Sequence, residues 1–332
     1  MSAPLVSVLV VNFNAGEHLT RCLGALAGQS FADFEVVLID NGSTDGSFDR
    51  ALAAVPALSG RLRAERAGAN LGFAAANNRA AGLARGRWLA TLNPDAFAAP
   101  DWLAQLISAT ERHAGVAMFG STQRMAGAPG TLDGTGDAYH VLGIAWRGSF
   151  GHPAADLPPE GEVFGPCAAA ALYRRDAFDA AGGFDERFFC YHEDVDLAFR
   201  LRLAGHRCIQ VAAASVDHVG SATTGRTSDF SVYHGTRNRL WTLVKNMPAA
   251  LFWPVLPATA AVHVYLLMRA RSVGTFGATW RGMRDALCGI APIWRERRRL
   301  QAARQAPTSV IARALTWPIG KLRRRAHDVR PA

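Results

Sequence analysis

Asn93, Pro94 and Asp95 are the residues of this sequence whose position best suits chemistry. They follow a short apolar run, residues 88–92, and end it abruptly. Ligand crevices in open α/β sheets lie beyond the carboxyl ends of the strands, which would place the Asp95 carboxylate at such a crevice. There it could hold a metal ion against a phosphate. Asn-Pro-Asp is also a good turn sequence, and the motif alone does not separate the two interpretations.

A second acidic group, Glu193 and Asp194, opens a predicted helix that ends near Gly205. The helix dipole stabilises carboxylates in a first turn, so a purely structural role explains their position. Asp196 and Arg200 stand four residues apart and are predicted to pair on the helix surface.

Polar side chains also follow two predicted strands of the N-terminal half. Asp40 could hydrogen-bond a base or a ribose, whereas Asp45 could cap the next helix, and both interpretations remain open. The polar residues of these two segments include Asn12, Asn14, Asp40, Ser43 and Asp45.

A third such segment, Asn70, Leu71, Gly72 and Phe73, opens an alanine-rich helix. It is either a helix N-terminus with a tight turn or a set of amides that face a nucleotide. The glycine fingerprint of dinucleotide-binding proteins and the Gly-Lys-Ser/Thr phosphate loop are missing, which argues against a nicotinamide enzyme or a P-loop NTPase.

The elements that must position these residues alternate between two periodicities. Short β-branched or apolar runs are typical of strands buried on both faces of a parallel sheet, and runs at helical spacing separate them. The sequence therefore predicts an α/β fold. Strands are expected at 5–11, 34–39, 88–92, 116–119 and 208–211, helices at 19–26, 74–83 and 101–113, and loops with short strands at 121–162.

Composition supports a large folded domain with an appendage. The chain has 332 residues and 49% hydrophobic content, enough for a substantial core. Its five cysteines are scattered without a Cys-x-x-Cys pair, which argues against a disulfide framework and a zinc site. The N-terminus runs into a strand with no charged leader, so we expect the catalytic part in the cytoplasm.

The C-terminal part is predicted to associate with a membrane. Residues 249–268 contain no charged side chain, but Pro254, Pro257 and His263 favour an in-plane or re-entrant hydrophobic hairpin over a spanning helix. Residues 269–332 carry 15 Lys and Arg against 3 Asp and Glu, interspersed with tryptophans, which suits anionic lipid. No nucleic-acid recognition motif accompanies these charges, so no nucleic-acid partner is expected.

Four motifs in this order resemble the family-two inverting glycosyltransferases of GT-A fold. Asn-Pro-Asp in place of Asp-x-Asp is similar to their rhamnosyltransferase-like branch. The motifs are Val-Ser-Val-Leu-Val-Val-Asn-Phe-Asn, Val-Leu-Ile-Asp-Asn-Gly-Ser-Thr-Asp-Gly, Asn-Leu-Gly-Phe and Leu-Asn-Pro-Asp.

The resemblance implies a role for each candidate residue. It makes Asp194, with Glu193 second, the general base that deprotonates an acceptor hydroxyl. Asp95 and His218 would hold Mg²⁺ or Mn²⁺, although Asn93 in place of an aspartate lowers the charge of that site. Arg237 and Arg239 would contact phosphate, with a solvated basic turn as the equal alternative. The donor, a dTDP- or UDP-sugar, would contact Asn12, Asn14, Asp40, Ser43, Asn70, Gly72, Phe73, Asn93 and Asp95.

The same resemblance implies an organisation for the chain. A GT-A domain, Rossmann-like with a mostly parallel sheet and helices on both faces, would cover residues 1–245. Residues 1–97 would bind the nucleotide and 98–245 the acceptor, a glycan or a lipid-linked molecule. The hydrophobic and basic helical tail, 246–332, would keep the protein peripheral or monotopic at the cytoplasmic face of the inner membrane. A sugar-phosphate nucleotidyltransferase and a non-catalytic membrane scaffold are the alternatives.

Overall fold

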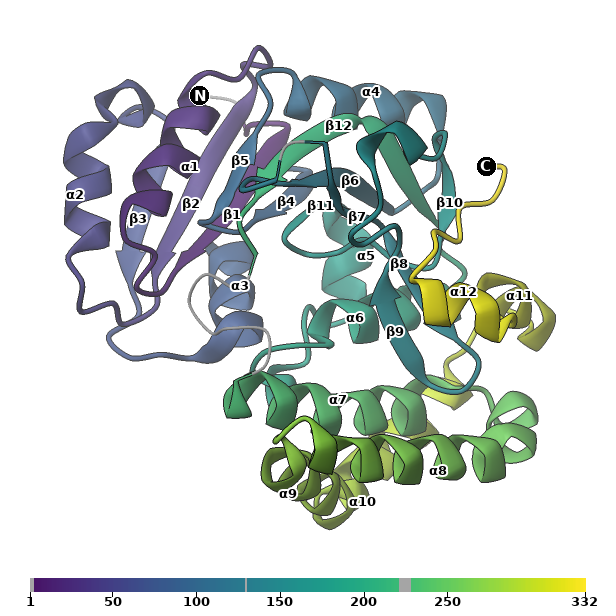
Figure 1. Ribbon diagram of the computed structural model, residues 1–332. Coiled ribbons are helices and arrows are strands. Elements are labelled where there is room, and N and C mark those ends of the chain that lie inside the picture. The colour runs from purple at the N-terminus through teal and green to yellow at the C-terminus, as the bar shows by residue number, and fades with distance from the viewer. Residues whose placement is uncertain (1–2, 129, 221–227) are drawn as a thin grey trace.

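A ten-stranded sheet forms the centre of the molecule (Figure 1). The computed structural model describes residues 3–128, 130–220 and 228–332, so Met1 and Ser2 of the predicted leaderless N-terminus lie outside the described residues. The main path of the sheet has the order β10-β12-β6-β11-β4-β1-β2-β3, and β5 and β7 pair with β12 and β6. This arrangement confirms the predicted α/β class.

The N-terminal half contains only parallel strand pairs. β1 lies between β2 and β4, and β3 follows β2 at the edge. The register Asn12 to Asp40 brings the carboxyl ends of β1 and β2 to the same edge of the sheet. The elements are β1 (Val6–Asn12), α1 (Glu17–Ala27), β2 (Phe34–Asp40), α2 (Ser47–Ala54), η1 (Pro56–Leu58), β3 (Leu62–Arg66), α3 (Gly72–Leu83) and β4 (Trp88–Leu92).

Strand β1 is buried because it carries apolar side chains on both faces of the sheet. Val6, Val8 and Val10 belong to the core beneath α1 and α4, whereas Leu9 belongs to the core beneath α3. Successive side chains of a strand point to opposite faces, so an uninterrupted apolar run serves both cores. This is the physical reason that the run 5–11 predicted a covered strand correctly.

The second half adds antiparallel pairs. β11 joins β4 to β6 and is antiparallel to both, while β12 is parallel to β6. The region 121–162 forms loops and short strands, as predicted. The elements are β5 (Ala96–Ala98), α4 (Trp102–Arg112), β6 (Met118–Met125), β7 (Leu132–Thr135), β8 (Asp137–His140), β9 (Ile144–Arg147), η2 (Ala154–Asp156), β10 (Gly161–Val163), β11 (Ala170–Arg174), α5 (Arg175–Ala180), η3 (Glu186–Phe188), α6 (Glu193–Leu203) and β12 (Cys208–His218).

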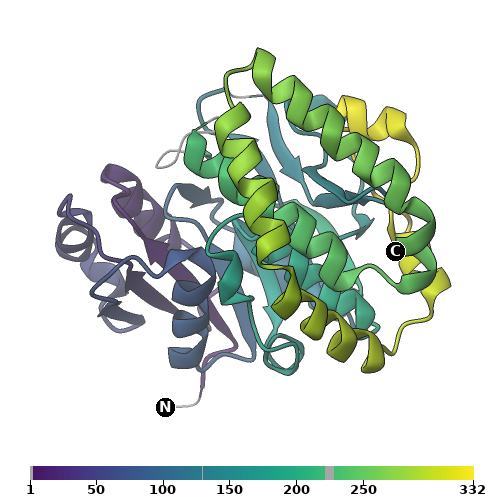
Figure 2. The ribbon, with the colours of Figure 1, turned by 90° about the horizontal axis from the view of Figure 1, so that it is seen from below.

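Helices form the rest of the chain. Helix α7 packs against α6, and α8, α9 and α10 lie on the outer side of α7 (Figure 2). The bounds are α7 (Asp229–Asn246), α8 (Ala249–Ser272), α9 (Phe276–Cys288), α10 (Ile290–Ala302), α11 (Thr308–Ala314) and α12 (Ile319–Arg324).

Helix α8 corrects the predicted hairpin, because it continues for 24 residues through Pro254 and Pro257. A helical proline removes one backbone hydrogen bond but need not end the helix when the freed carbonyl is not buried in protein. Both prolines lie on the exposed side, while Phe252, Thr259 and His263 on the other side remain packed. Among the described residues, α8 is the one helix long and apolar enough to cross a membrane.

The end of the chain returns to the body that contains the large sheet. The boundary predicted at residue 245 coincides with the end of α7, but Ile311 and Leu315 beyond it belong to the large core cluster. Arg330 forms an antiparallel β-bridge with Glu162 of β10. Parts of the last thirty residues therefore pack against the α/β body.

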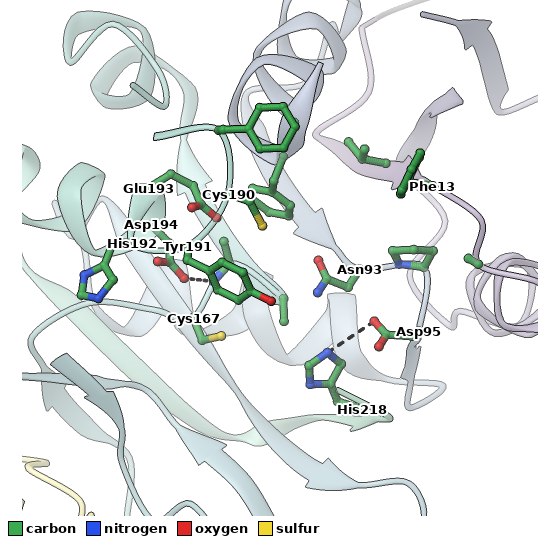
Figure 3. Close-up of a pocket in the computed structure, with 18 of the residues that line it drawn as sticks. Phe13, Asn93, Asp95, Cys167, Cys190, Tyr191, His192, Glu193, Asp194 and His218 are labelled. Carbon is green, nitrogen blue, oxygen red and sulfur yellow. Dashed lines mark hydrogen bonds and ion pairs between the residues drawn. The ribbon is translucent and has the colours of Figure 1, made fainter. Parts of the chain in front are cut away.

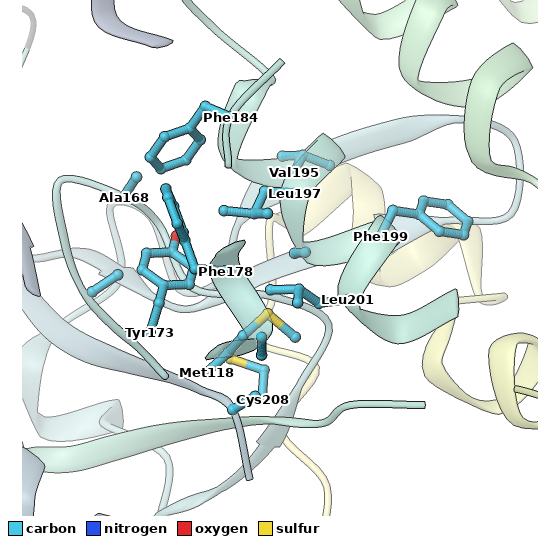
Figure 4. Close-up of a cluster of buried hydrophobic side chains, with 14 of the residues drawn as sticks. Met118, Ala168, Tyr173, Phe178, Phe184, Val195, Leu197, Phe199, Leu201 and Cys208 are labelled. Carbon is cyan, nitrogen blue, oxygen red and sulfur yellow. The ribbon is translucent and has the colours of Figure 1, made fainter. Parts of the chain in front are cut away.

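Buried charges join α6 to α7. Arg200 donates to Asp196 at 2.8 Å, as predicted, but both side chains are buried and not on the surface. The reason is the fully buried Lys245 of α7, whose ammonium group donates to Asp196 at 2.8 Å and to Asp185 at 2.5 Å. On its other side, α6 presents Val195, Leu197 and Leu201 to an aromatic core (Figure 4).

Candidate active site

A cavity of about 970 Å³ opens at the carboxyl edge of the parallel strands. Its walls come from the residues after β1 and β4, the start of α3, the hairpin β8–β9 and the first turn of α6. Asp95 and His218 line one side, and Glu193 and Asp194 line the other (Figure 3). The two acidic centres predicted from the sequence therefore share one cavity of a size typical for ligand sites.

Asp95 and His218 meet because strand β12 runs antiparallel to β5. The register pairs His218 with Ala96, the neighbour of Asp95. His218 Nε2 lies 3.4 Å from Asp95 Oδ1, and the amide of Gly220 donates to Asp95 Oδ2 at 3.1 Å. Burial opposes charge on Asp95, but the His218 ring and the Gly220 amide hold the pKa of its carboxyl below the usual value.

This pair fits a divalent cation that also has other ligands. Within the described part of the chain, His218 Nε2 is buried without a hydrogen-bond partner, and in its unprotonated form this nitrogen could bind a cation. Among the described residues, no group of three or more His, Cys, Asp or Glu side chains could hold a metal alone. Mg²⁺ sites typically combine one or two protein ligands with phosphate oxygens, and an imidazole ligand also suits Mn²⁺.

Asp194 and Glu193 differ in their hydrogen bonds. The amides of Val195 and Ala168 donate to Asp194 at 2.8 and 3.2 Å, which stabilises its carboxylate form. Glu193 Oε2 is buried and finds no hydrogen-bond partner among the residues that the structure describes. Burial raises the pKa of both carboxyl groups, and the charge of Asp194 raises that of Glu193 further. Asp194 is therefore the more readily ionised of the two.

A strained turn sets the first residues of α6. Phe189, Tyr191 and His192 adopt φ angles of 63°, 68° and 68°, a region that residues other than glycine seldom occupy. Such residues are concentrated at active sites, where surrounding structure enforces them. Asn238 of α7 holds this turn, since its amide donates to the carbonyl groups of Phe188, Cys190 and Tyr191.

The predicted nucleotide-sugar residues divide into two groups. Asn14, Asn70, Gly72, Phe73 and Asn93 line the cavity together with Asp95. Asn12, Asp40 and Ser43 do not line it, because the Asn12 side chain uses its amide group to hold Asp40 at 3.0 Å and Ser43 at 3.0 Å.

The hydrogen bonds of the buried Asn12 side chain thus hold the loop between β2 and α2. Asp45 accepts from the backbone amides of Ser47 at 3.0 Å and Gly16 at 2.9 Å, which supports the helix-capping interpretation of this residue. Asn41, which the sequence did not single out, lines the cavity instead of Asp40 and donates to Asn70 at 3.0 Å.

Arg237 and Arg239 do not line the cavity, and their predicted phosphate contact stays a prediction. They belong to α7 and not to a solvated turn. Arg237 donates to the carbonyl of Phe188 at 3.1 Å and stacks on Trp241 at 4.5 Å, and Arg239 donates to His263 at 3.3 Å. Their guanidinium groups are therefore engaged in holding helices together.

Three further polar residues line the cavity that were not predicted from the sequence. Asp137 and Arg147 come from the hairpin β8–β9, and Tyr191 precedes α6. The sequence around Asp137 and Arg147 shows no motif, and only the tertiary pairing of short strands brings these two residues to the site. Tyr191 lies two residues before Glu193 but was not assigned a role. Phe13 was visible as part of Asn-Phe-Asn after the first strand but was not assigned a role.

Comparison with known proteins gives a consistent result. Residues 7–182 match the family model described as Glycosyl transferase family 2. The chain is 33% identical over 262 residues to the N-acetylglucosaminyl-diphospho-decaprenol L-rhamnosyltransferase of Mycobacterium tuberculosis, covering 69% of this chain and 81% of that protein.

Solved structures show the same fold at low sequence identity. The mannosyltransferase PcManGT of Pyrobaculum calidifontis, in complex with GDP-Man and Mn²⁺, has a TM-score of 0.55 at 19% identity, covering 91% of this chain and 86% of that one. S. aureus TarS 1-349 in complex with UDP-GlcNAc has a TM-score of 0.52 at 18% identity, covering 76% and 71%. Of the longer TarS chain, the match covers 40%.

Proposed function

Because this chain belongs to glycosyl transferase family 2, we propose that it transfers a sugar, rhamnose being our first choice, from a nucleoside-diphosphate donor to a hydroxyl of a lipid-linked glycan. The observation that carries this proposal is the placement of Asp95 with His218 and of Asp194 on opposite sides of one cavity. Rhamnose and the lipid-linked acceptor rest on the name of the mycobacterial relative. The family assignment does not support the nucleotidyltransferase alternative.

The donor is proposed to lie between the two halves of the cavity. Phe13, Asn14, Asn41 and Asn70 would contact the nucleoside, since they line the N-terminal side. Asp95 and His218 would hold Mg²⁺ or Mn²⁺, which would offset negative charge on the departing diphosphate. Asp95 would thus serve the donor side of the cavity, across from Asp194.

Asp194 is proposed as the general base. An acceptor hydroxyl that enters beside Asp194 would lose its proton to this carboxylate while its oxygen attacks the anomeric carbon from the face opposite the diphosphate. One displacement from that face inverts the anomeric configuration. Proton removal by a positioned base contributes about 10²–10⁴-fold to such reactions.

Nucleotide binding tests this function directly. We expect UDP or dTDP, each with Mn²⁺, to raise the melting temperature, because a ligand at 100 times its Kd stabilises the folded state by about 2.7 kcal/mol. The Asp95→Asn variant should lose the part of the shift that depends on Mn²⁺. Absence of a shift with any nucleoside diphosphate, with or without Mn²⁺, would overturn the proposal.

Helices α8 and α9 are proposed to dock on the cytoplasmic face of a membrane. Large apolar side chains project outward from them, with Trp253 56%, Tyr265 62% and Leu287 67% exposed. The opposite side of α8 holds buried Thr259 and His263 against the protein body. A helix fixed lengthwise in this way lies in the plane of the membrane, with nearby arginines available to anionic lipid.

Charges on this outer face are expected to weaken membrane binding. The double variant Trp253→Glu, Tyr265→Glu should bind anionic vesicles at least about tenfold more weakly, since two aromatic side chains would no longer enter the interface. Co-sedimentation with vesicles measures this effect. The control is Ala53→Glu, Ala54→Glu on α2, which adds the same charge at exposed positions away from α8 (Figure 1). Equal losses in both double variants would contradict a specific docking face.

A further inference from the structure

Asp133 is a buried carboxylate in direct contact with the proposed cation site. It lies on β7, within the region 121–162 that was predicted to form loops and short strands. Its Oδ2 atom is 2.7 Å from His218 Nδ1. A carboxylate can only accept a hydrogen bond, so Nδ1 must carry the proton of the ring. The other ring nitrogen, Nε2, lies 3.4 Å from Asp95 Oδ1, and in the neutral Nδ1–H tautomer its lone pair is free to bind a cation there.

A β-bulge aims the Asp133 side chain at His218. Strand β7 pairs with β6 through Gly134 opposite Gln123 and Leu132 opposite Arg124, which leaves Asp133 as the extra residue between them. A bulge changes the direction of a side chain relative to a regular strand and is common beside active sites. A second irregularity, between Val211 and Ser215, precedes His218 on β12.

Arg147 holds Asp133 from the other side. Its guanidinium forms an ion pair with the same Oδ2 atom that accepts from His218. Gly134 allows this approach, because a Cβ atom there would lie 3.2 Å from the Arg147 side chain. Asp133 is therefore held by both Arg147 and His218.

We propose that Asp133 is the positioning residue of the cation site: it fixes the ring of His218 and its Nδ1–H tautomer, so that Nε2 and Asp95 together present a ready pair of ligands. This inference rests on the proposed function, since it assumes that Asp95 and His218 bind a divalent cation. Carboxylates that orient a ligating histidine also raise its basicity, and their loss typically lowers metal affinity about 10–100-fold.

The Asp133→Asn variant tests this role. Mn²⁺ affinity, measured by electron paramagnetic resonance in the presence of UDP or dTDP, is expected to fall about 10–100-fold relative to wild type. Nucleotide affinity without metal should remain unchanged. Asp217→Asn is the matched control, because Asp217 is exposed and adjacent to His218 on the same strand. This control should bind Mn²⁺ as wild type does.

Two experimental results would refute the positioning role of Asp133, and a different result would refute the proposed function. Unchanged Mn²⁺ affinity in folded Asp133→Asn refutes the positioning role. If this variant does not fold, the tautomer can be measured in the wild-type protein instead. Nitrogen NMR of ¹⁵N-histidine-labelled protein at alkaline pH shows which ring nitrogen of His218 carries the proton. The His218→Asn variant identifies the His218 signals. A proton on Nε2 in place of Nδ1 also refutes the role. Failure of wild-type protein to bind Mn²⁺ with any nucleotide would instead refute the proposed function.

Discussion

The Asp194→Asn variant is expected to transfer sugar about 10²–10⁴-fold more slowly than wild type, because an amide cannot accept the proton of the acceptor hydroxyl. Donor binding should be preserved, since Asp194 lies across the cavity from Asp95 and His218. The measurement is the rate of nucleoside diphosphate release with an acceptor that supports wild-type turnover. Unchanged product formation would revive the scaffold alternative.

The pH profile and a neighbouring variant identify the base more closely. Burial raises the pKa of Asp194, so the carboxylate forms at higher pH than for an ordinary aspartate. The wild-type rate should therefore rise as pH increases through that raised pKa and fall in acid. Glu193→Gln keeps the two amide hydrogen bonds to Asp194 and should retain far more activity than Asp194→Asn. The reverse order would assign the base to Glu193.

The Asp196→Asn variant is expected to lose about 3–5 kcal/mol of unfolding free energy, the cost of breaking a buried ion pair by removing one partner. Arg200 and Lys245 would remain buried with less negative charge beside them. Urea denaturation at neutral pH measures this loss. Asp49→Asn removes an exposed partner of Arg66 and should leave the unfolding free energy nearly unchanged, because solvent screens exposed ion pairs.

Acid should reduce the difference between wild type and Asp196→Asn. Burial opposes the Asp196 charge, but Lys245 and Arg200 outweigh it and hold the pKa of this carboxyl below its usual value. A lowered folded-state pKa gives stability that is present at neutral pH and is lost as pH falls through that pKa. Equal unfolding free energies of Asp196→Asn and wild type at neutral pH would show that the cluster does not stabilise the junction of α6 and α7.

The sequence predicted those parts of the site that follow regular elements closely. Asp95 follows β4 and Glu193 begins α6, so local periodicity was sufficient to place both. Ordinary strand and helix boundaries are determined mainly by neighbouring residues, which are visible in the sequence. His218 was found through resemblance, and its pairing with β5 explains its position beside Asp95.

Long-range contacts account for what the sequence did not predict. Asp133 reaches His218 through a bulge, and Arg147 arrives on a separate two-stranded hairpin, neither of which leaves a periodic signal. Asp40 was a plausible nucleotide ligand by position, yet Asn12 engages it inside the fold. The sequence shows which side chains are polar but not which partner each will find.

The proposed reaction requires one cavity that holds the cation and the base on opposite sides of the sugar. A crystal structure with Mn²⁺ and the nucleoside diphosphate that gives the larger thermal shift tests this claim most directly. We predict an anomalous manganese peak between Asp95, His218 Nε2 and the diphosphate, with Asp194 across the cavity from the nucleotide. Nucleotide bound elsewhere, or manganese bound away from Asp95 and His218, would contradict the account.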